Sequence, residues 1–142
     1  MKNLFRIAMF ASLMLSSTPH AARADDAIFQ AFGGTPGLTH IVDDFVATVL
    51  VDPRIKDFFA KADIPRLKTQ LVAQFCQLIG GPCTYTGADM AQAHRGMGVH
   101  DVHFNALAED LQLAMDRAGV PFSKQNYLVA RLAPMEKQIS VK

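Results

Sequence analysis

Apolar side chains recur at helical spacing in four stretches of the chain, with polar positions between them. In the first stretch the apolar positions advance by three and four residues: Leu38, Ile41, Val42, Phe45, Val46, Val49 and Leu50. Such a stripe is typical of an amphipathic helix that buries one face. Thr35 is a suitable cap and Pro36 suits the first turn. Asp52-Pro53 predicts the end of the helix, because the residue before proline disfavours the helical region.

A second helix is predicted to begin near Asp63, with Pro65 in its first turn. Its apolar positions form a four-residue ladder: Leu67, Leu71, Phe75 and Ile79. Gly80-Gly81-Pro82 ends this pattern. Residues 80–98 contain five of the nine glycines of the chain, so we expect mostly loop there, with a short helical turn over residues 90–94.

The third predicted helix begins at Asp101 as its cap and stops at Gly119. One face carries its apolar residues: Phe104, Leu107, Ala108, Leu111, Ala114, Met115 and Ala118. Ser123 caps a fourth helix, in which Pro134 predicts a kink. Its inward positions are Tyr127, Leu128, Leu132 and Ile139. No useful length of chain alternates with a period of two, so the prediction is an all-α domain of four main helices in two pairs.

The N-terminal residues have the pattern of a secretory signal peptide. Lys2 and Arg6 precede an apolar run over residues 7–15, and Ala22-Arg23-Ala24 places small residues where signal peptidase reads them. The run is far shorter than the ~20 residues that span a bilayer. We therefore expect a signal peptide over residues 1–24 and one domain over residues 25–142. The protein is expected to be exported, to the bacterial periplasm, with no membrane span in the mature chain.

Composition narrows the function classes. The chain has 142 residues, of which 50% are hydrophobic and 19% charged, with a formal charge of +1. So high a share of hydrophobic residues, with so little net charge, excludes intrinsic disorder. The three basic residues of the leader leave 11 basic and 13 acidic residues in the mature chain, a formal charge of −2. Neither charge provides the electrostatic footprint of a nucleic-acid-binding protein, so we expect no nucleic-acid partner.

Common catalytic motifs do not occur in this sequence. It has no Cys-x-x-Cys-His haem attachment, Gly-x-Ser-x-Gly elbow, P-loop or dinucleotide fingerprint. His100 and His103 are three residues apart, but no third ligand has convincing spacing for zinc, so we interpret them as two solvated histidines at a helix start. Cys76 and Cys83 could close a small loop as a disulfide in an oxidising compartment. Alternatively, Cys76 is a buried apolar residue and Cys83 a loop thiol.

His94 follows Met90 by four residues and is flanked by Gly96 and Gly98. By its spacing alone it would be an ordinary surface or core histidine. Residues 27–139, however, resemble a group I truncated haemoglobin. The resemblance rests on motifs that follow one another with nearly gapless spacing: Phe32-Gly33-Gly34 with Gly37, residues 52–59, Arg66-Leu67-Lys68, residues 80–87, residues 90–94 and residues 118–121.

This resemblance implies a fold and a cofactor. The family fold is a two-on-two helical sandwich, and the cofactor is haem b, held non-covalently. By the resemblance, His94 is the proximal ligand of the haem iron and Phe59 packs on the porphyrin. The other wall positions that match the family are Tyr85, Met90, Phe104 and Leu132. The positions that match the distal side are Phe45, Val46, Leu67, Gln70, Leu71 and Phe75.

The distal positions depart from the family pattern. Many group I members have a tyrosine where Val46 stands, and often a glutamine where Leu71 stands; such groups hydrogen-bond bound oxygen and slow its release. Here Gln70 is the only polar candidate nearby. We therefore expect oxygen to be bound without the strong hydrogen bond that tyrosine provides in those members. This puts efficient nitric oxide detoxification in doubt.

Three function classes follow. The first is a haem protein that reversibly binds a diatomic gas: oxygen, nitric oxide or carbon monoxide. The second is a haem enzyme, a nitric oxide dioxygenase or a peroxidase-like enzyme, which needs an external reductase as electron donor. The third is a non-haem thiol-redox domain with Cys76 and Cys83 as its active feature.

Overall fold

The computed structural model describes residues 22–141, all of whose regular elements are helical. Residues 1–21 of the predicted signal peptide lie outside this range. The α-helices are α1 (Ala22–Ala31), α2 (Gly34–Val49), α3 (Ile64–Leu78), α4 (Met90–Ala93), α5 (Asp101–Arg117), α6 (Phe122–Leu132) and α7 (Glu136–Ile139). Two 3-10 helices complete the set, η1 (Lys56–Phe59) and η2 (Ala133–Met135).

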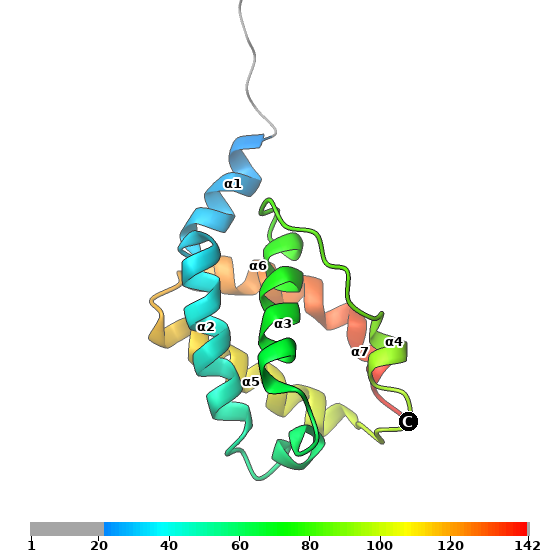
Figure 1. Cartoon of the computed structure of the whole chain (residues 1–142). Coiled ribbons are helices and arrows are strands. Elements are labelled where there is room, and N and C mark those ends of the chain that lie inside the picture. Colours follow the sequence, from blue (N-terminus) through cyan, green and yellow to red (C-terminus); the bar gives the residue numbers. More distant parts are fainter. Residues whose placement is uncertain (1–21, 142) are drawn as a thin grey trace, which may run out of the picture.

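Four long helices form two layers (Figure 1). Helices α2 and α3 lie side by side in one layer, and α5 and α6 cross behind them. The short helices α4 and α7 lie together at one side of this sandwich. The arrangement confirms the predicted all-α, two-on-two fold. No helix within residues 22–141 has the length and apolarity needed to cross a membrane.

Helix α1 is an element that apolar spacing did not predict. It packs against the start of α2 and buries Ile28 and Phe29, and Phe32, just after the helix, is also buried. Its side chains therefore extend the core at one end of the sandwich. The helix begins at Ala22, so the predicted cleavage after Ala24 falls within its first turn.

The core follows the predicted apolar stripes except at two helix ends. All of the predicted stripe of α2 is buried except Leu50, which is 39% exposed because the helix ends at Val49. Ala118 is likewise exposed, since α5 ends at Arg117. The end of α2 lies three residues before the expected Asp52. The predicted kink at Pro134 corresponds to η2, which separates α6 from α7.

Three predicted helix caps are wrong by one or two residues. Gly33 precedes α2 in place of Thr35, with a left-handed φ of 78° that glycine adopts without strain. Its neighbour Gly37 is also required, because a Cβ there would lie 2.0 Å from the carbonyl oxygen of Phe32. The other two caps are His100 in place of Asp101 and Pro121 in place of Ser123.

The remaining predicted stops and starts are confirmed. Asp63 caps α3 by accepting a hydrogen bond from the Arg66 N–H, at 3.1 Å. Gly119 follows α5 with a φ of 71°, the conformation expected of a C-terminal glycine. Helix α4 lies where a short turn was predicted, and Asp89 caps it through the Gln92 N–H, at 2.7 Å.

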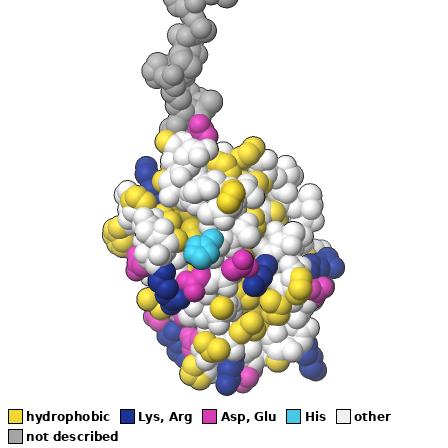
Figure 2. Space-filling model, turned by 60° about the vertical axis from the view of Figure 1, so that its left-hand side comes forward, with side chains coloured by type: hydrophobic (Ala, Val, Ile, Leu, Met, Phe, Trp, Pro, Cys, Tyr) yellow, Lys and Arg dark blue, Asp and Glu magenta, His cyan; other side chains and the backbone are white. Residues whose placement is uncertain are grey.

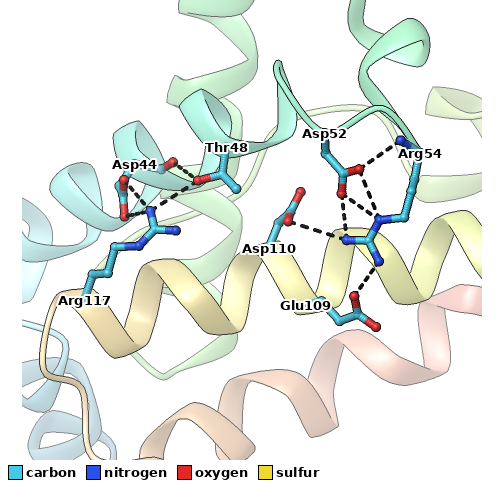
Figure 3. Close-up of polar contacts among 7 residues, drawn as sticks. All are labelled: Asp44, Thr48, Asp52, Arg54, Glu109, Asp110 and Arg117. Atoms are coloured by element: carbon cyan, nitrogen blue, oxygen red, sulfur yellow. Dashed lines mark hydrogen bonds and ion pairs between the residues drawn. The ribbon is translucent and has the colours of Figure 1, made fainter.

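Two arginines fix the crossing of α2 and α5 (Figure 3). Arg117 on α5 binds the Asp44 carboxylate on α2 at 2.9 Å. At the other end of the crossing, Arg54 binds Asp52 through two nitrogens, at 2.7 and 2.9 Å, and also pairs with Glu109 on α5. These contacts hold the corner that leads from α2 into η1, and η1 carries Phe58 and Phe59.

The Arg54 cluster contains two carboxyl groups with opposite pKa shifts. Hydrogen bonds from Arg54 lower the pKa of Asp52. Burial raises the pKa of Asp110. Within residues 22–141 its Oδ2 has no hydrogen-bond partner, and its Oδ1 lies 3.9 Å from Arg54. Elsewhere, Figure 2 shows a face on which acidic and basic side chains are interspersed, without a patch of one sign.

Candidate functional site

Two adjoining cavities lie between the helical layers. The larger has a volume of about 520 Å³ and the smaller about 130 Å³. Six residues line both: Phe45, Leu71, Gln74, Met90, His94 and Leu107. The larger volume falls within the ~300–1,000 Å³ typical of ligand and cofactor sites. Because they share these six residues, the two cavities form one candidate site with a larger and a smaller part.

The structure brings all of the predicted site residues to these two cavities. The larger is lined by Phe45, Val46, Phe59, Leu67, Gln70, Leu71, Tyr85, Met90 and His94. The smaller is lined by Phe45, Leu71, Phe75, Met90, His94, Phe104 and Leu132. Most of these side chains are apolar, so the walls suit a flat, largely apolar ligand.

His94 is held in one orientation by the first residue of α4. Its Nδ1 lies 2.8 Å from the carbonyl oxygen of Met90. A carbonyl oxygen only accepts, so Nδ1 carries a proton and donates it, and Nε2 is the ring nitrogen available to bind a metal. A second partner that fixes the tautomer in this way is typical of histidines that bind metals. His94 can therefore act as a single axial ligand.

Apart from Gln70, Gln74 and the rim residue Arg66, the side chains of α2 and α3 that line the larger cavity are apolar. Val46 is 2% exposed, and Leu67 and Leu71 are partly buried one turn apart on α3. Further apolar residues that sequence reasoning did not assign to the site also line the cavities, among them Val49, Phe58 and Leu107. The signal for Val49 and Leu107 was only their place on predicted apolar faces, which does not separate site from core.

Gln74 is a polar residue of the site that sequence reasoning missed. It is 8% exposed and lines both cavities. The prediction that Gln70 is the only polar candidate is therefore wrong. Gln74 is four residues after Gln70, so the two amides share a face of α3, and this spacing was the available signal.

Gln70 lies beside the loop that follows α3. Its Oε1 is buried and has no hydrogen-bond partner among the described residues. A Cβ at Gly87 would lie 2.4 Å from this oxygen and 2.4 Å from the Tyr85 hydroxyl, so a larger residue there would force these side chains to shift. The loop backbone thus closes this side of the larger cavity.

The rim of the larger cavity carries basic side chains. Lys61 and Arg66 line it and are exposed, with Asp63 between them in the sequence. Both cations are outside the set predicted as site residues, although Arg66 belongs to one of the recognised motifs. A rim of this kind can bind the carboxylates of a ligand whose apolar part lies inside.

A disulfide joins Cys76 to Cys83, which decides between the two alternatives left open for these cysteines. It links the end of α3 to the loop over residues 80–89. A hydrogen bond to a side chain also joins this loop to α3, from the Tyr85 N–H to Oε1 of Gln77, at 2.6 Å. Burial raises the pKa of the Tyr85 phenol, which donates to the carbonyl oxygen of Ala88 at 2.7 Å.

His100 and His103 lie outside both cavities. Nδ1 of His103 accepts a hydrogen bond from the His100 N–H at 3.0 Å, so this histidine helps to cap α5 instead of being merely solvated. Its ring also packs edge-on against Phe58. Within residues 22–141, no group of three or more His, Cys, Asp or Glu side chains could hold a metal ion.

Comparison with known proteins places the chain beside globins. The bacterial-like globin family matches residues 27–141. A group 1 truncated haemoglobin of Mycolicibacterium paratuberculosis is 35% identical over 114 residues, which cover 80% of this chain and 84% of that protein. The crystal structure of truncated haemoglobin from Tetrahymena pyriformis, in its Fe(III) form, has a TM-score of 0.77 and 30% identity, and the match covers 81% of this chain and 98% of that one.

A further structural relative contains a bound cofactor. The 2/2 haemoglobin from Synechococcus sp. PCC 7002, in the cyanomet state and with covalently attached haem, has a TM-score of 0.74 and 25% identity. The match covers 79% of this chain and 96% of that one.

The disulfide predicts a measurable dependence of stability on reductant. A cross-link that closes so short a loop contributes about 2–3 kcal/mol by constraining the unfolded chain. We expect a dithiol to lower the free energy of unfolding by that amount and to speed amide hydrogen exchange over residues 82–88. The control is the Cys76→Ala/Cys83→Ala double variant, which reductant should not affect. Equal stability of the wild-type chain with and without dithiol would contradict the prediction.

Proposed function

Because the chain belongs to the bacterial-like globin family, and within it to the group 1 truncated haemoglobins, we propose that it binds haem b and reversibly holds a diatomic gas at the haem iron. The observation that carries the proposal is the cavity of about 520 Å³ with apolar walls and one oriented imidazole, that of His94. Family membership supports the binding of haem and of a gas. That the haem is haem b and that His94 is its axial ligand is our proposal.

The residues present fit a haem group. The apolar walls suit the porphyrin face, with Phe59 packed on it, and Lys61 and Arg66 are at the rim, where they could pair with the two carboxylates of haem. Held non-covalently, the group would depend on these contacts and on His94. The sequence has two cysteines and the disulfide uses both, which leaves no thiol for a covalent link.

His94 would hold the iron through Nε2. When bound, the haem would supply an iron that takes oxygen, nitric oxide or carbon monoxide. The apolar side chains that α2 and α3 contribute to the cavity would help to exclude water from it. Because Nδ1 donates to the Met90 carbonyl, the imidazole keeps its orientation, with Nε2 as the nitrogen available to the iron.

The distal wall supports gas binding over enzymatic turnover. Acid–base catalysis requires a titratable group within reach of the reacting atoms. Among the described residues that line the cavities, the titratable ones are His94, Tyr85 and the rim residues Lys61, Asp63 and Arg66. A nitric oxide dioxygenase or peroxidase-like activity would also need an external reductase. The thiol-redox alternative is weaker still, because Cys76 is fully buried and neither cysteine lines the cavities.

We further propose that the protein is exported, to the bacterial periplasm, after removal of residues 1–24. Support comes from the sequence pattern of the leader. Intact-mass measurement of the protein from a periplasmic extract tests this: the expected chain begins at Asp25 and contains one disulfide. A full-length mass in the soluble cytoplasmic fraction would contradict it.

His94 is the residue to test for haem ligation. We expect the purified protein to be red, with a strong Soret band that weakens or shifts in His94→Gly, and free imidazole to restore much of it by occupying the space of the side chain. His40→Gly is the matched control, because His40 is exposed on α2 and lines neither cavity. A colourless wild-type protein after haem supplementation, or an unchanged spectrum in His94→Gly, would refute the assignment.

Oxygen dissociation tests the apolar distal wall. A hydrogen bond contributes about 0.5–1.5 kcal/mol, and about 1.4 kcal/mol corresponds to tenfold. Val46→Tyr introduces a hydroxyl into the larger cavity and should slow oxygen release from the ferrous protein by about tenfold. Stopped-flow measurement gives the rate, with Val46→Phe as the control for size. A wild-type rate already as slow as that of Val46→Tyr, and insensitive to Gln70→Leu, would overturn the hypothesis that oxygen is bound without a strong hydrogen bond from the distal wall.

A further inference from the structure

The amide of Gln74 lies where three segments of the chain meet. Its Nε2 lies 3.7 Å from Sδ of Met90, the first residue of α4, and 3.9 Å from Sδ of Met135, the last residue of η2. Gln74 itself is on α3. One buried amide group therefore contacts both the helix that precedes His94 and the C-terminal segment.

The surroundings of this amide are otherwise apolar. Within the described chain, Gln74 and His94 are the only polar side chains that line the smaller cavity. A thioether sulfur is a weak acceptor, and a buried amide is costly unless its donors are bonded. A methionine at this position would fill the same space without that cost. The N–H groups of Gln74 are directed to the two sulfurs and not to the opposite wall.

Met90 in turn determines where the His94 imidazole points. Its carbonyl oxygen accepts hydrogen bonds from Nδ1 of His94, at 2.8 Å, and from the backbone N–H of the same residue, at 3.1 Å. Helix α4 has only four residues, which is too short to be stable on its own. The carbonyl therefore stays in place only if contacts with other segments hold Met90.

We infer that Gln74 is a positioning residue for His94: it holds Met90 against α3 and thereby fixes the carbonyl that orients the imidazole. The inference rests on the proposed function in that His94 is taken as the axial ligand. It adds that a residue on the helix opposite α4 controls the strength of the axial bond. Loss of the amide frees the carbonyl, weakens the Nδ1–H hydrogen bond and makes the imidazole a poorer donor.

The test compares Gln74→Met with Gln112→Met in the haem-loaded protein. Gln74→Met keeps the length of the side chain and removes its donors, and Gln112 is a matched control on α5 that lines neither cavity. In the ferrous carbon monoxide form, NMR follows exchange of the His94 Nδ1 proton with water. In the ferrous form without gas, resonance Raman follows the iron–imidazole stretch. Transfer of haem to an acceptor protein gives the rate of haem loss.

We expect Gln74→Met to speed exchange of the Nδ1 proton, lower the stretching frequency and raise the rate of haem loss about tenfold, the lower end of effects from outer-shell partners. Met90→Leu removes the sulfur but keeps the carbonyl, and should act in the same direction. The Gln74→Met/Met90→Leu double variant should show no further change, because the two residues act through one contact.

Three outcomes overturn the inference while leaving the proposed function intact. One is a Gln74→Met protein indistinguishable from Gln112→Met. Another is additive effects in the double variant. The third is a changed rate of gas dissociation with an unchanged Nδ1 exchange and stretching frequency, which would mean that Gln74 acts directly on the gas. A wild-type protein that takes up no haem contradicts the proposed function instead.

Discussion

The apolar face of α2 packs on two helices at once, α3 beside it and α5 behind it. Leu38, Ile41 and Val42 are buried in the shared core, and further along the same face Phe45 and Val46 line the cavities. Core and site therefore use one continuous stripe. A change in the position of α2 would alter both. The contact of Arg117 on α5 with Asp44 on α2, and the contacts of Arg54 with Asp52 after α2 and with Glu109 on α5, oppose such a change.

The opposite side of the site depends on contacts between distant segments. Helix α4 is four residues long and follows a loop without regular structure. The Asp89 cap, the disulfide and the carbonyl of Met90 each restrict it at a different point. His94 owes its orientation to this set of contacts, because a single helical turn has too few hydrogen bonds of its own.

Polar groups within the site are few and each has a definite place. Gln70 lies against the Gly87 backbone, and Gln74 lies between the sulfurs of two methionines. The wall formed by Val46, Leu67 and Leu71 has no hydrogen-bond donor in its side chains. These three side chains form an apolar part of the wall, while the amide of Gln74 contacts the segments that carry Met90 and Met135.

By itself, the sequence determined the four long helices, the position of α4 and the candidate role of His94. Apolar spacing reports which face of a helix is buried, and the glycine motifs mark where helices end. Tertiary structure decided the Cys76–Cys83 pairing, the place of Gln74 and the caps at Gly33, His100 and Pro121. The physical reason is that periodicity describes one helix at a time, whereas these features depend on which distant atoms come into contact when the helices pack.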